Sequence, residues 1–211
     1  MIDVHYWPTP NGRKVTIMLE ECGLEYRIVP VSIPKNEQKL PDFLKLNPNG
    51  RIPAIVDRSP KDGGQPVVVF ESGAILQYLA EKTGKFWPAE VRKRYEVAQW
   101  LMWQMGGVGP IAGQASHFLN SAPEKIPYAT DRFVKEAGRL YKVLDTHLAG
   151  RDYVAGEYSI ADMAIYPWAV PIDRQGHKMD DFPNLKAWVA RVGARPATKR
   201  GFDAGADLRK P

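Results

Sequence analysis

Hydrophobic and polar positions in the first 86 residues predict alternating strands and helices. Four apolar or β-branched runs predict strands at 2–7, 26–33, 52–57 and 67–70. Between the first two, apolar residues spaced i, i+3, i+4 and i+7 predict a helix, namely Val15, Met18, Leu19 and Cys22. We expect Asn11 to cap the start of this helix and Gly23 to end it.

Two further helices complete this half, a short one at 41–47 and another at 72–84. The predicted order is therefore β-α-β-α-β-β-α. Alternation of strand and helix favours a parallel pair at the start. The turn residues 60–64 predict a hairpin, so the last two strands should be antiparallel.

Helical patterns alone follow from about residue 90. A helix should start around Val97 and Leu101 and be bent or broken by the glycines at 106–109. Another is indicated by apolar residues at near-regular spacing from Phe133 to Leu148. The run 159–162 predicts a capping box, and an amphipathic face at 185–192 predicts a last helix that ends at Pro196. We expect the last ten residues to fray.

Composition makes this an ordinary globular chain with a mildly basic surface. Of its 211 residues, 44% are hydrophobic and 25% charged, and the net charge is +5. The basic clusters are short, 92–94 and 199–200, which argues against nucleic acid as a partner. No apolar run approaches the roughly 18–20 residues of a membrane span, so we expect no membrane insertion.

The cysteine and histidine residues indicate whether a cysteine nucleophile or a metal site is to be expected. Cys22 is the only cysteine, and it should lie on the buried face of the first helix rather than act as a nucleophile. The start of the chain does not read as a secretory signal, and with one cysteine a reducing, cytoplasmic setting is expected. The four histidines have no metal-ligand spacing, so no metal is expected.

Four short motifs carry the functional prediction, by their order along the chain. They are Thr9-Pro10-Asn11, Ile52-Pro53, Glu71-Ser72 and the run 159–162. In this order and spacing the chain resembles the glutathione transferase superfamily over nearly its whole length. Further segments resemble the bacterial nu class, which is related to the yeast prion-forming nitrogen regulator: 8–12, 57–60, 70–75, 106–110, 122–129 and 195–198.

This resemblance implies an α/β thioredoxin-like N-terminal domain and an all-α C-terminal helical domain, the glutathione-transferase fold. We place the first, glutathione-binding domain at 1–86. The helical domain, at 90–202, should supply a substrate pocket and the interface of a homodimer. Glutathione is the implied co-substrate.

Glutathione-binding residues follow from the resemblance, and the chemistry of each suits its role. Glu71-Ser72 begins a helix, where backbone N–H groups and the dipole favour the γ-glutamyl carboxylate. Ser72 can donate its hydroxyl proton to that carboxylate, and Glu71 can accept from the ammonium. We expect Ile52-Pro53 to be a cis peptide that offers the Ile52 backbone to the cysteinyl moiety.

The two remaining binding residues lie further apart in the chain. Gln38, in a polar loop, should bind the glycine carboxylate through its carboxamide, with Lys39 and Asn49 as further candidates nearby. The resemblance also implies that Arg132 reaches glutathione across a dimer interface.

The thiol end of glutathione decides the chemistry. The residue that contacts the glutathione sulfur could be Tyr6, Thr9 or Asn11. Tyr6 should instead pack inside its strand. Thr9 and Asn11 fall at the strand-to-helix turn, where a hydroxyl, an amide and first-turn N–H groups lower a thiol pKa from about 8.5. Lowering it by about one unit requires only about 1.4 kcal/mol of preferential thiolate binding.

These residues predict a glutathione-dependent disulfide-bond oxidoreductase with weak glutathione transferase activity. The second substrate would be a small disulfide or an electrophile. Two alternatives stay open. One is a conjugating transferase whose pocket lies near Trp103, Phe118 and Trp168, and the other is a non-enzymatic glutathione-binding regulator.

Overall fold

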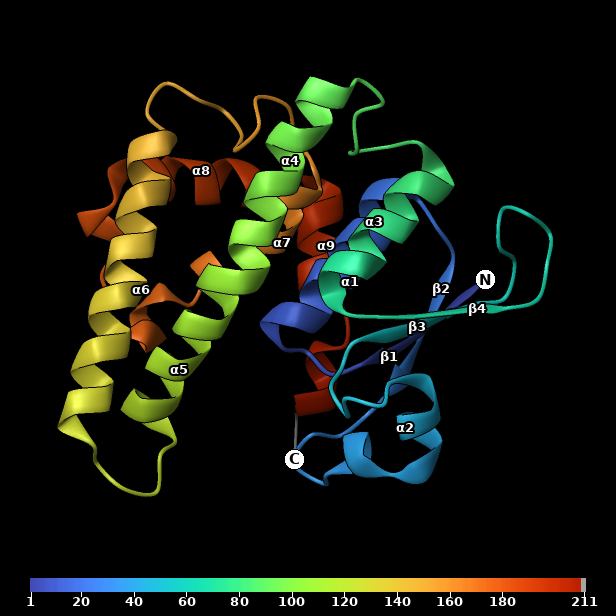
Figure 1. Ribbon diagram of the computed structural model, residues 1–211, viewed down its shortest axis with the longest axis horizontal. Helices are drawn as coiled ribbons and strands as arrows, with labels where there is room; N and C mark the ends of the chain where they lie inside the picture. Colours follow the sequence, from blue (N-terminus) through green and yellow to red (C-terminus); the bar gives the residue numbers. More distant parts are fainter. Residues whose placement is uncertain (210–211) are drawn as a thin grey trace. The chain divides into compact units, whose positions relative to one another are not determined.

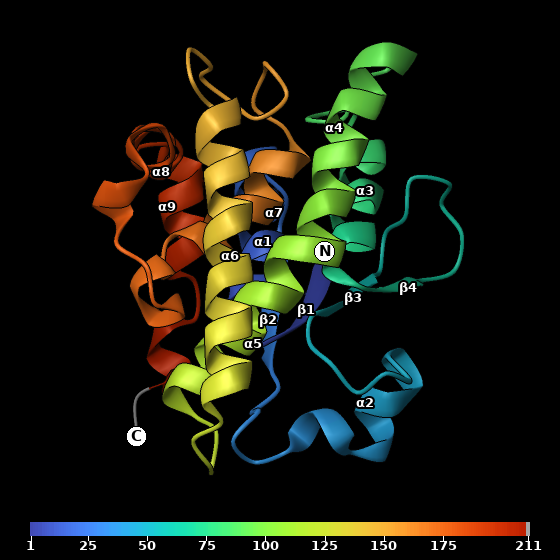
Figure 2. The same ribbon diagram turned by 60° about the vertical axis from the view of Figure 1, so that its left-hand side comes forward.

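The computed structural model describes residues 1–209, and these form two compact units (Figures 1 and 2). Met1–Trp87 and the segment from Arg195 make up the first unit, and Pro88–Ala194 the second. The boundaries 1–86 and 90–202 stay predictions as functional domains. The C-terminal segment, which we expected with the helices, instead groups with the first unit, because its helix packs on the first helix of the chain.

A four-stranded sheet of order β2-β1-β3-β4 forms the frame of the first unit. The strands are β1 (Ile2–Tyr6), β2 (Tyr26–Pro30), β3 (Ala54–Asp57) and β4 (Val67–Phe70). As predicted, β1 pairs with β2 in parallel and β3 with β4 as an antiparallel hairpin. An antiparallel pairing of β1 with β3 joins these two pairs of strands into one sheet. The sequence pattern did not indicate this pairing.

Helices cover both faces of this sheet. They are α1 (Pro10–Cys22), α2 (Pro41–Leu46), α3 (Ser72–Thr83) and, from the end of the chain, α9 (Pro196–Asp203). Helices α1 and α3 pack together on one face, whereas α2 lies on the other (Figure 1). Bidentate hydrogen bonds from Arg195 to Glu21, at 2.7 and 2.8 Å, tie the start of α9 to α1.

Helices alone build the second unit. They are α4 (Val91–Trp103), α5 (Gly109–Asn120), α6 (Pro127–His147), α7 (Ile160–Ala169) and α8 (Pro183–Gly193). A π-helical turn, Gln104–Val108, separates α4 from α5. This is the interruption predicted at the glycines, where the weak helix propensity of Gly106 and Gly107 permits irregular hydrogen bonding.

Some helix and strand ends predicted from the sequence are wrong, mainly at prolines and near the end of the chain. Pro196 follows α8 but also opens α9, because proline is well tolerated at the first helical position. The segment expected to fray forms a further turn of 3₁₀ helix, Ala206–Arg209, and the final two residues lie outside the described range. Three strands are shorter than predicted, since β1 ends at Tyr6, β2 ends at Pro30 and β3 starts only after Pro53.

The core of the second unit is α7, whose residues are almost all buried. Its start is the predicted capping box, in which the Ser159 hydroxyl accepts from the backbone N–H of Ala161. The buried Asp162 carboxylate accepts from the backbone N–H groups of Ser159 and Val154, both at 3.0 Å. It also accepts from the Trp188 indole at 2.9 Å. The Asp162 side chain therefore joins α7 to α8 and to the loop between α6 and α7.

Within residues 1–209, none of the helices combines the length and apolar character needed to cross a membrane.

Replacing Asp162 with alanine should lower the free energy of unfolding by about 3 kcal/mol or more, because several buried donors lose their acceptor. Chemical denaturation followed by circular dichroism measures this. Asp152→Ala is the matched control, since that carboxylate is exposed and its ion pair with Arg191 contributes less than about 1 kcal/mol. Equal losses in the two variants would contradict the role assigned to Asp162.

Candidate functional site

The register of the sheet gathers three of the predicted motifs at one edge. Ala54, at the start of β3, pairs with His5 near the end of β1 and with Phe70 at the end of β4. The chain segments that follow β1 and β4, and the one that precedes β3, therefore leave the sheet on the same side. These segments carry Thr9-Pro10-Asn11, Glu71-Ser72 and Ile52-Pro53, respectively.

The turn after β1 is capped by Thr9, not by Asn11 as we expected. Thr9 has extended backbone angles, and its Oγ1 accepts from the backbone N–H of Gly12 at 3.3 Å. Pro10 then occupies the first helical position, so Asn11 falls inside the first turn of α1. The hydroxyl has two acceptor lone pairs and one proton, so a Thr9 that accepts from Gly12 can still donate.

Gly12 is required by the close approach of this turn to the strand. A Cβ at this position would lie 2.3 Å from the carbonyl oxygen of Trp7 and 2.8 Å from the Tyr6 ring. Tyr6 itself is fully buried and donates its hydroxyl to the Ala204 carbonyl at 2.9 Å. Burial raises the pKa of Tyr6, which agrees with the expectation that this residue packs rather than reacts.

A groove of about 810 Å³ opens beside Thr9. Its lining combines apolar, hydroxyl and charged side chains from the turn, the loop after β2 and the C-terminal segment: Trp7, Thr9, Pro30, Ser32, Ile33, Pro34, Lys35, Glu37, Leu208 and Arg209. Arg209 also donates to the Pro8 carbonyl, so the C-terminal segment is attached to the turn that holds Thr9. This part of the groove was not predicted, because the polar and small residues near the end of the chain give no periodic signal.

Helix α3 starts with an unusual backbone. Glu71 has φ 68° and ψ 120°, in the positive-φ region that only glycine enters freely. Glu71 is the N-cap residue, yet its side chain makes no capping hydrogen bond, so its carboxylate is not used to close the helix. Such a helix start, with N–H groups and the positive end of the dipole, suits an anion.

Ser72 is the first residue of α3 and is 3% exposed. Its Oγ accepts a hydrogen bond of 3.3 Å from the ammonium of Lys14, which is buried on α1. Lys14 was not among the residues predicted from the sequence. A signal existed, because Lys14, Met18 and Cys22 lie at i, i+4 and i+8, which places a lysine on the predicted buried stripe.

Ile52-Pro53 is a cis peptide, as predicted. The Ile52 side chain packs against a buried cluster of Val31, Phe43 and Ala54. This contact fixes the loop that enters β3 at the edge where the other two motifs lie.

Gln38 lies in a 3₁₀ turn, Glu37–Lys39, and is 9% exposed. Within the described residues, the Oε1 atom of its carboxamide is buried and has no hydrogen-bond partner. Amide oxygen and nitrogen can exchange places by a flip, so this orphan position can be filled by either a donor or an acceptor. A polar ligand atom would satisfy it.

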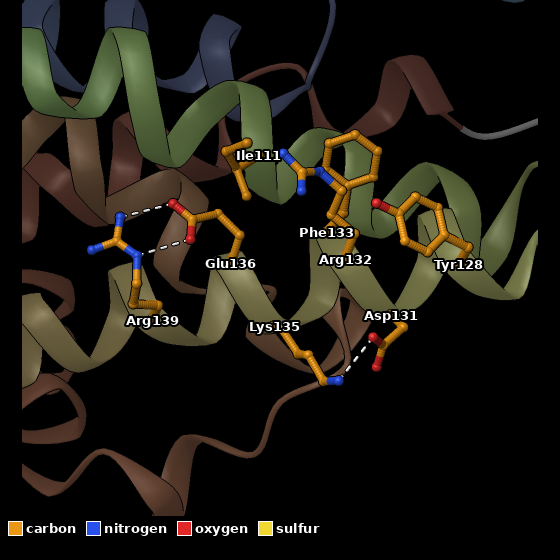
Figure 3. Close-up of a pocket in the computed structure, with 8 residues that line it drawn as sticks. All are labelled: Ile111, Tyr128, Asp131, Arg132, Phe133, Lys135, Glu136 and Arg139. Carbon is orange, nitrogen blue, oxygen red and sulfur yellow. Dashed lines mark hydrogen bonds and ion pairs between the residues drawn. The ribbon is translucent and has the colours of Figure 1, made fainter.

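Arg132 lies in the second unit, in a groove of about 570 Å³ along α6 (Figure 3). Its neighbours are paired: Lys135 with Asp131 at 2.8 Å, and Arg139 with Glu136 at 2.7 Å. Within residues 1–209, Arg132 has no carboxylate at ion-pair distance. The Arg132 guanidinium lies beside Phe133 and Ile111, so this groove offers a cation next to apolar surface.

The aromatic residues of the alternative substrate pocket each pack against a neighbour in the second unit. Trp103 packs edge-on to Trp100, Phe118 stacks on Phe133 at 5.5 Å, and Trp168 covers Gly113. Among the described residues there is also no cluster of three His, Cys, Asp or Glu side chains that could hold a metal ion.

Comparison with known proteins identifies the architecture. The family model "Glutathione S-transferase, N-terminal domain" matches residues 9–82, and "Glutathione S-transferase, C-terminal domain" matches residues 112–196. The chain is 51% identical to the disulfide-bond oxidoreductase YfcG of Escherichia coli, over 94% of this chain and 93% of that protein.

Solved structures agree with the sequence matches. A glutathione transferase from Pseudomonas putida, with one glutathione disulfide bound per subunit, is 44% identical and superimposes with a TM-score of 0.92, covering 97% of this chain and 91% of that one. Ure2p in complex with glutathione is 30% identical, with a TM-score of 0.86 over 95% of this chain and 97% of that one. The predicted fold and superfamily are therefore confirmed.

Gly12→Ala should lower the free energy of unfolding by about 1–3 kcal/mol, because the added methyl group overpacks the turn against Trp7 and Tyr6. Thermal or urea denaturation measures the change. Gly106→Ala is the matched control, since a Cβ there meets no neighbouring atom within 4 Å. The close approach at Gly12 would be refuted if both variants were as stable as the parent.

Proposed function

Because the chain belongs to the glutathione S-transferase family, we propose that it is a glutathione-dependent disulfide-bond oxidoreductase with weak transferase activity. The observation that carries this proposal is the turn at Thr9, which offers a hydroxyl proton beside the first turn of α1. No cysteine lies in this turn, so the reacting sulfur would belong to glutathione.

Thr9 and Asn11 are the proposed catalytic residues. The Thr9 hydroxyl would donate to the glutathione sulfur, and Asn11 would donate through its amide or its first-turn backbone. Donors of this kind at a helix start favour the thiolate over the thiol. No general base is needed, because the thiol would release its proton to solvent.

The reaction consists of two thiol–disulfide exchanges. The thiolate of the first glutathione attacks one sulfur of the disulfide, forms a mixed disulfide and releases the other half as a thiolate, which takes a proton from water. The thiolate of a second glutathione then attacks the mixed disulfide at the glutathione sulfur. Two electrons pass from two glutathione molecules to the disulfide, giving glutathione disulfide and two thiols.

The remaining binding residues would each contact a different part of glutathione. We assign the γ-glutamyl carboxylate to Ser72 and the start of α3, and the γ-glutamyl ammonium to Glu71. The Ile52 backbone at Pro53 would pair with the cysteinyl moiety, and Gln38 would hold the glycine carboxylate. The buried carboxamide atom without a partner on Gln38 supports this last assignment, because a flip of the amide places the Nε2 donor there and a carboxylate needs a donor.

The relatives support glutathione chemistry without fixing the second substrate. YfcG is named a disulfide-bond oxidoreductase, and the Pseudomonas putida enzyme was crystallised with glutathione disulfide. We extend these properties to this chain by similarity. A reducing, cytoplasmic setting and a homodimer also belong to the proposal, the first supported by the single, buried Cys22.

Thr9→Ala should raise the pKa of bound glutathione thiol by about one unit and slow reduction of 2-hydroxyethyl disulfide about tenfold, because one donor to the thiolate is lost. Ultraviolet absorbance of the thiolate across pH and a coupled glutathione-reductase assay measure the two effects. Thr9→Ser, which keeps the hydroxyl, should behave like the parent.

Three outcomes separate this proposal from the alternatives. Glutathione binding without disulfide turnover, but with rapid conjugation of aryl halides or epoxides, would favour a conjugating transferase. Binding with inertness in both assays would favour a regulator. Parent-like turnover in Thr9→Ala would exclude Thr9 from catalysis.

Arg132 is proposed to act on the glutathione of a partner subunit. Mixing a Thr9→Ala/Asn11→Ala dimer with an Arg132→Ala dimer, followed by subunit exchange, should restore about a quarter of parent turnover per site, since each mixed dimer regains one intact site. Turnover after mixing, against each unmixed variant, measures this. Action of Arg132 within its own subunit predicts no recovery.

A further inference from the structure

The groove beside Thr9 has more surface than the proposed reaction uses. Of the described residues that line it, only Thr9 has a role in that reaction. Its volume of about 810 Å³ falls in the range of small-molecule sites, roughly 300–1,000 Å³. Every segment that lines it belongs to the first unit of the fold. A ligand much larger than a sulfur atom therefore has room next to Thr9.

The chemistry of disulfide exchange indicates what this room can hold. When the glutathione thiolate bonds to the near sulfur, the S–S bond of the substrate breaks and its electron pair goes to the far sulfur. The far half lies opposite the attacking sulfur, so it extends away from bound glutathione. Ile52, Glu71 and Ser72, which we assign to the rest of glutathione, are not among the described residues that line the groove. The groove thus adjoins the proposed sulfur position and is separate from those contacts.

We propose that this groove holds the departing half of the disulfide, and that Lys35 and Arg209 select halves that carry a carboxylate. This inference rests on the proposed function, because it takes Thr9 as the position of the reacting sulfur. It adds a substrate class, the disulfides of short thiol acids, and two residues that determine specificity.

The charged side chains of the groove favour an anion. Lys35 and Arg209 are cationic, and Glu37 is the one carboxylate among the described residues of the lining. Glu37 Oε2 accepts a hydrogen bond of 2.7 Å from the backbone N–H of Ser32, which holds this carboxylate against its own loop. No carboxylate within residues 1–209 lies at ion-pair distance from the exposed Lys35. A carboxylate that enters the groove would therefore be attracted by two cations.

The loop that carries Lys35 is closed by hydrogen bonds on both sides of this residue. The Glu37 N–H donates to the Ser32 carbonyl at 3.1 Å, in addition to the bond from Ser32 N–H to the Glu37 carboxylate. Inside this pair, the Asn36 N–H donates to the Ile33 carbonyl at 3.0 Å. The backbone of Lys35 is thus held in place at the groove, so binding an anion there requires little ordering of the loop.

Arg209 reaches the same groove from the end of the chain. Its guanidinium donates to the carbonyl of Pro8, next to Thr9. A guanidinium has five N–H donors in a planar fork that fits carboxylates, and this bond uses one of them. The Thr9 N–H donates to the Trp7 carbonyl at 2.7 Å, and the half-buried Trp7 adds apolar surface to the lining. The groove therefore suits a short apolar chain that ends in an anion.

Three disulfides of matched chain length test this preference on the parent protein. In 3,3′-dithiodipropionate, 2-hydroxyethyl disulfide and cystamine, two methylene groups separate each sulfur from an anionic, a neutral and a cationic group, respectively. With glutathione at saturation, kcat/KM for the disulfide reports the steps up to release of the first thiol. Dividing each value by the rate constant of the uncatalysed reaction with glutathione removes the intrinsic reactivity of the disulfide. The anionic disulfide should then be preferred to the cationic one by about tenfold or more.

Charge variants locate the preference in this groove. Lys35→Glu should lower the ratio of kcat/KM for the anionic to the cationic disulfide by about tenfold, and Arg209→Gln, which keeps an N–H donor for Pro8, by about threefold. Lys61→Glu is the matched control for Lys35→Glu. It reverses the charge of an exposed lysine in the β3–β4 loop, beyond the opposite end of β3 from the three motifs, and should keep the parent ratio.

Two results would overturn the inference. One is a parent that reduces all three disulfides without preferring the anionic one, and the other is a preference that Lys35→Glu and Arg209→Gln both leave unchanged. In each case the observed reduction would leave the proposed function standing. Failure of the parent to reduce any of the three above the uncatalysed rate would instead remove the proposed function, and this inference with it.

Discussion

The pairing of Ala54 with both His5 and Phe70 is the constraint on which the candidate site depends. Antiparallel neighbours place the end of one strand beside the start of the next. Three loops that are far apart in sequence therefore emerge at one edge of the sheet. A slip by one residue would turn each strand's side chains to the opposite face, so the buried faces of β1 and β3 also fix the position of the loops.

Two hydroxyl groups at this edge share one arrangement. Thr9 Oγ1 accepts from the Gly12 backbone, and Ser72 Oγ accepts from Lys14. In each case the protein fills an acceptor position of the hydroxyl oxygen and so limits how that hydroxyl can turn. Glutathione carries a negative group at each end of the proposed contact, a thiolate and a carboxylate. Polar groups that are held in place before any ligand arrives are the form of preorganisation that favours anions.

Much of the fold could be predicted from local pattern. Strand runs, the hairpin turn and the capping box at Ser159 are encoded within a few residues, so the order of elements in the first 86 residues and the box were predicted correctly. The errors came from residues whose local sequence fits more than one structural role. Asn11 and Thr9 are both good caps, and Pro196 can follow one helix or start the next.

Less of the candidate site than of the fold could be predicted from local sequence pattern. Its motifs were found by family resemblance, and their convergence required the β1–β3 pairing, which no local pattern encodes. Lys14 was missed because a charged residue on a helix is ordinarily exposed. Its burial and its contact with Ser72, from a helix more than fifty residues away, distinguish it from a surface lysine.

The buried charge at position 14 shows that two physical demands meet in α1. A methionine would fill a similar volume and avoid the desolvation penalty, and buried ion-pairing groups often gain stability when replaced in this way. It could not, however, donate the hydrogen bond that joins α1 to Ser72 at the start of α3. Desolvation and this hydrogen bond therefore act in opposite directions on the lysine. The lowered pKa of Lys14, about 7, follows from the first of them, because the burial that holds the ammonium against Ser72 also disfavours its charged form.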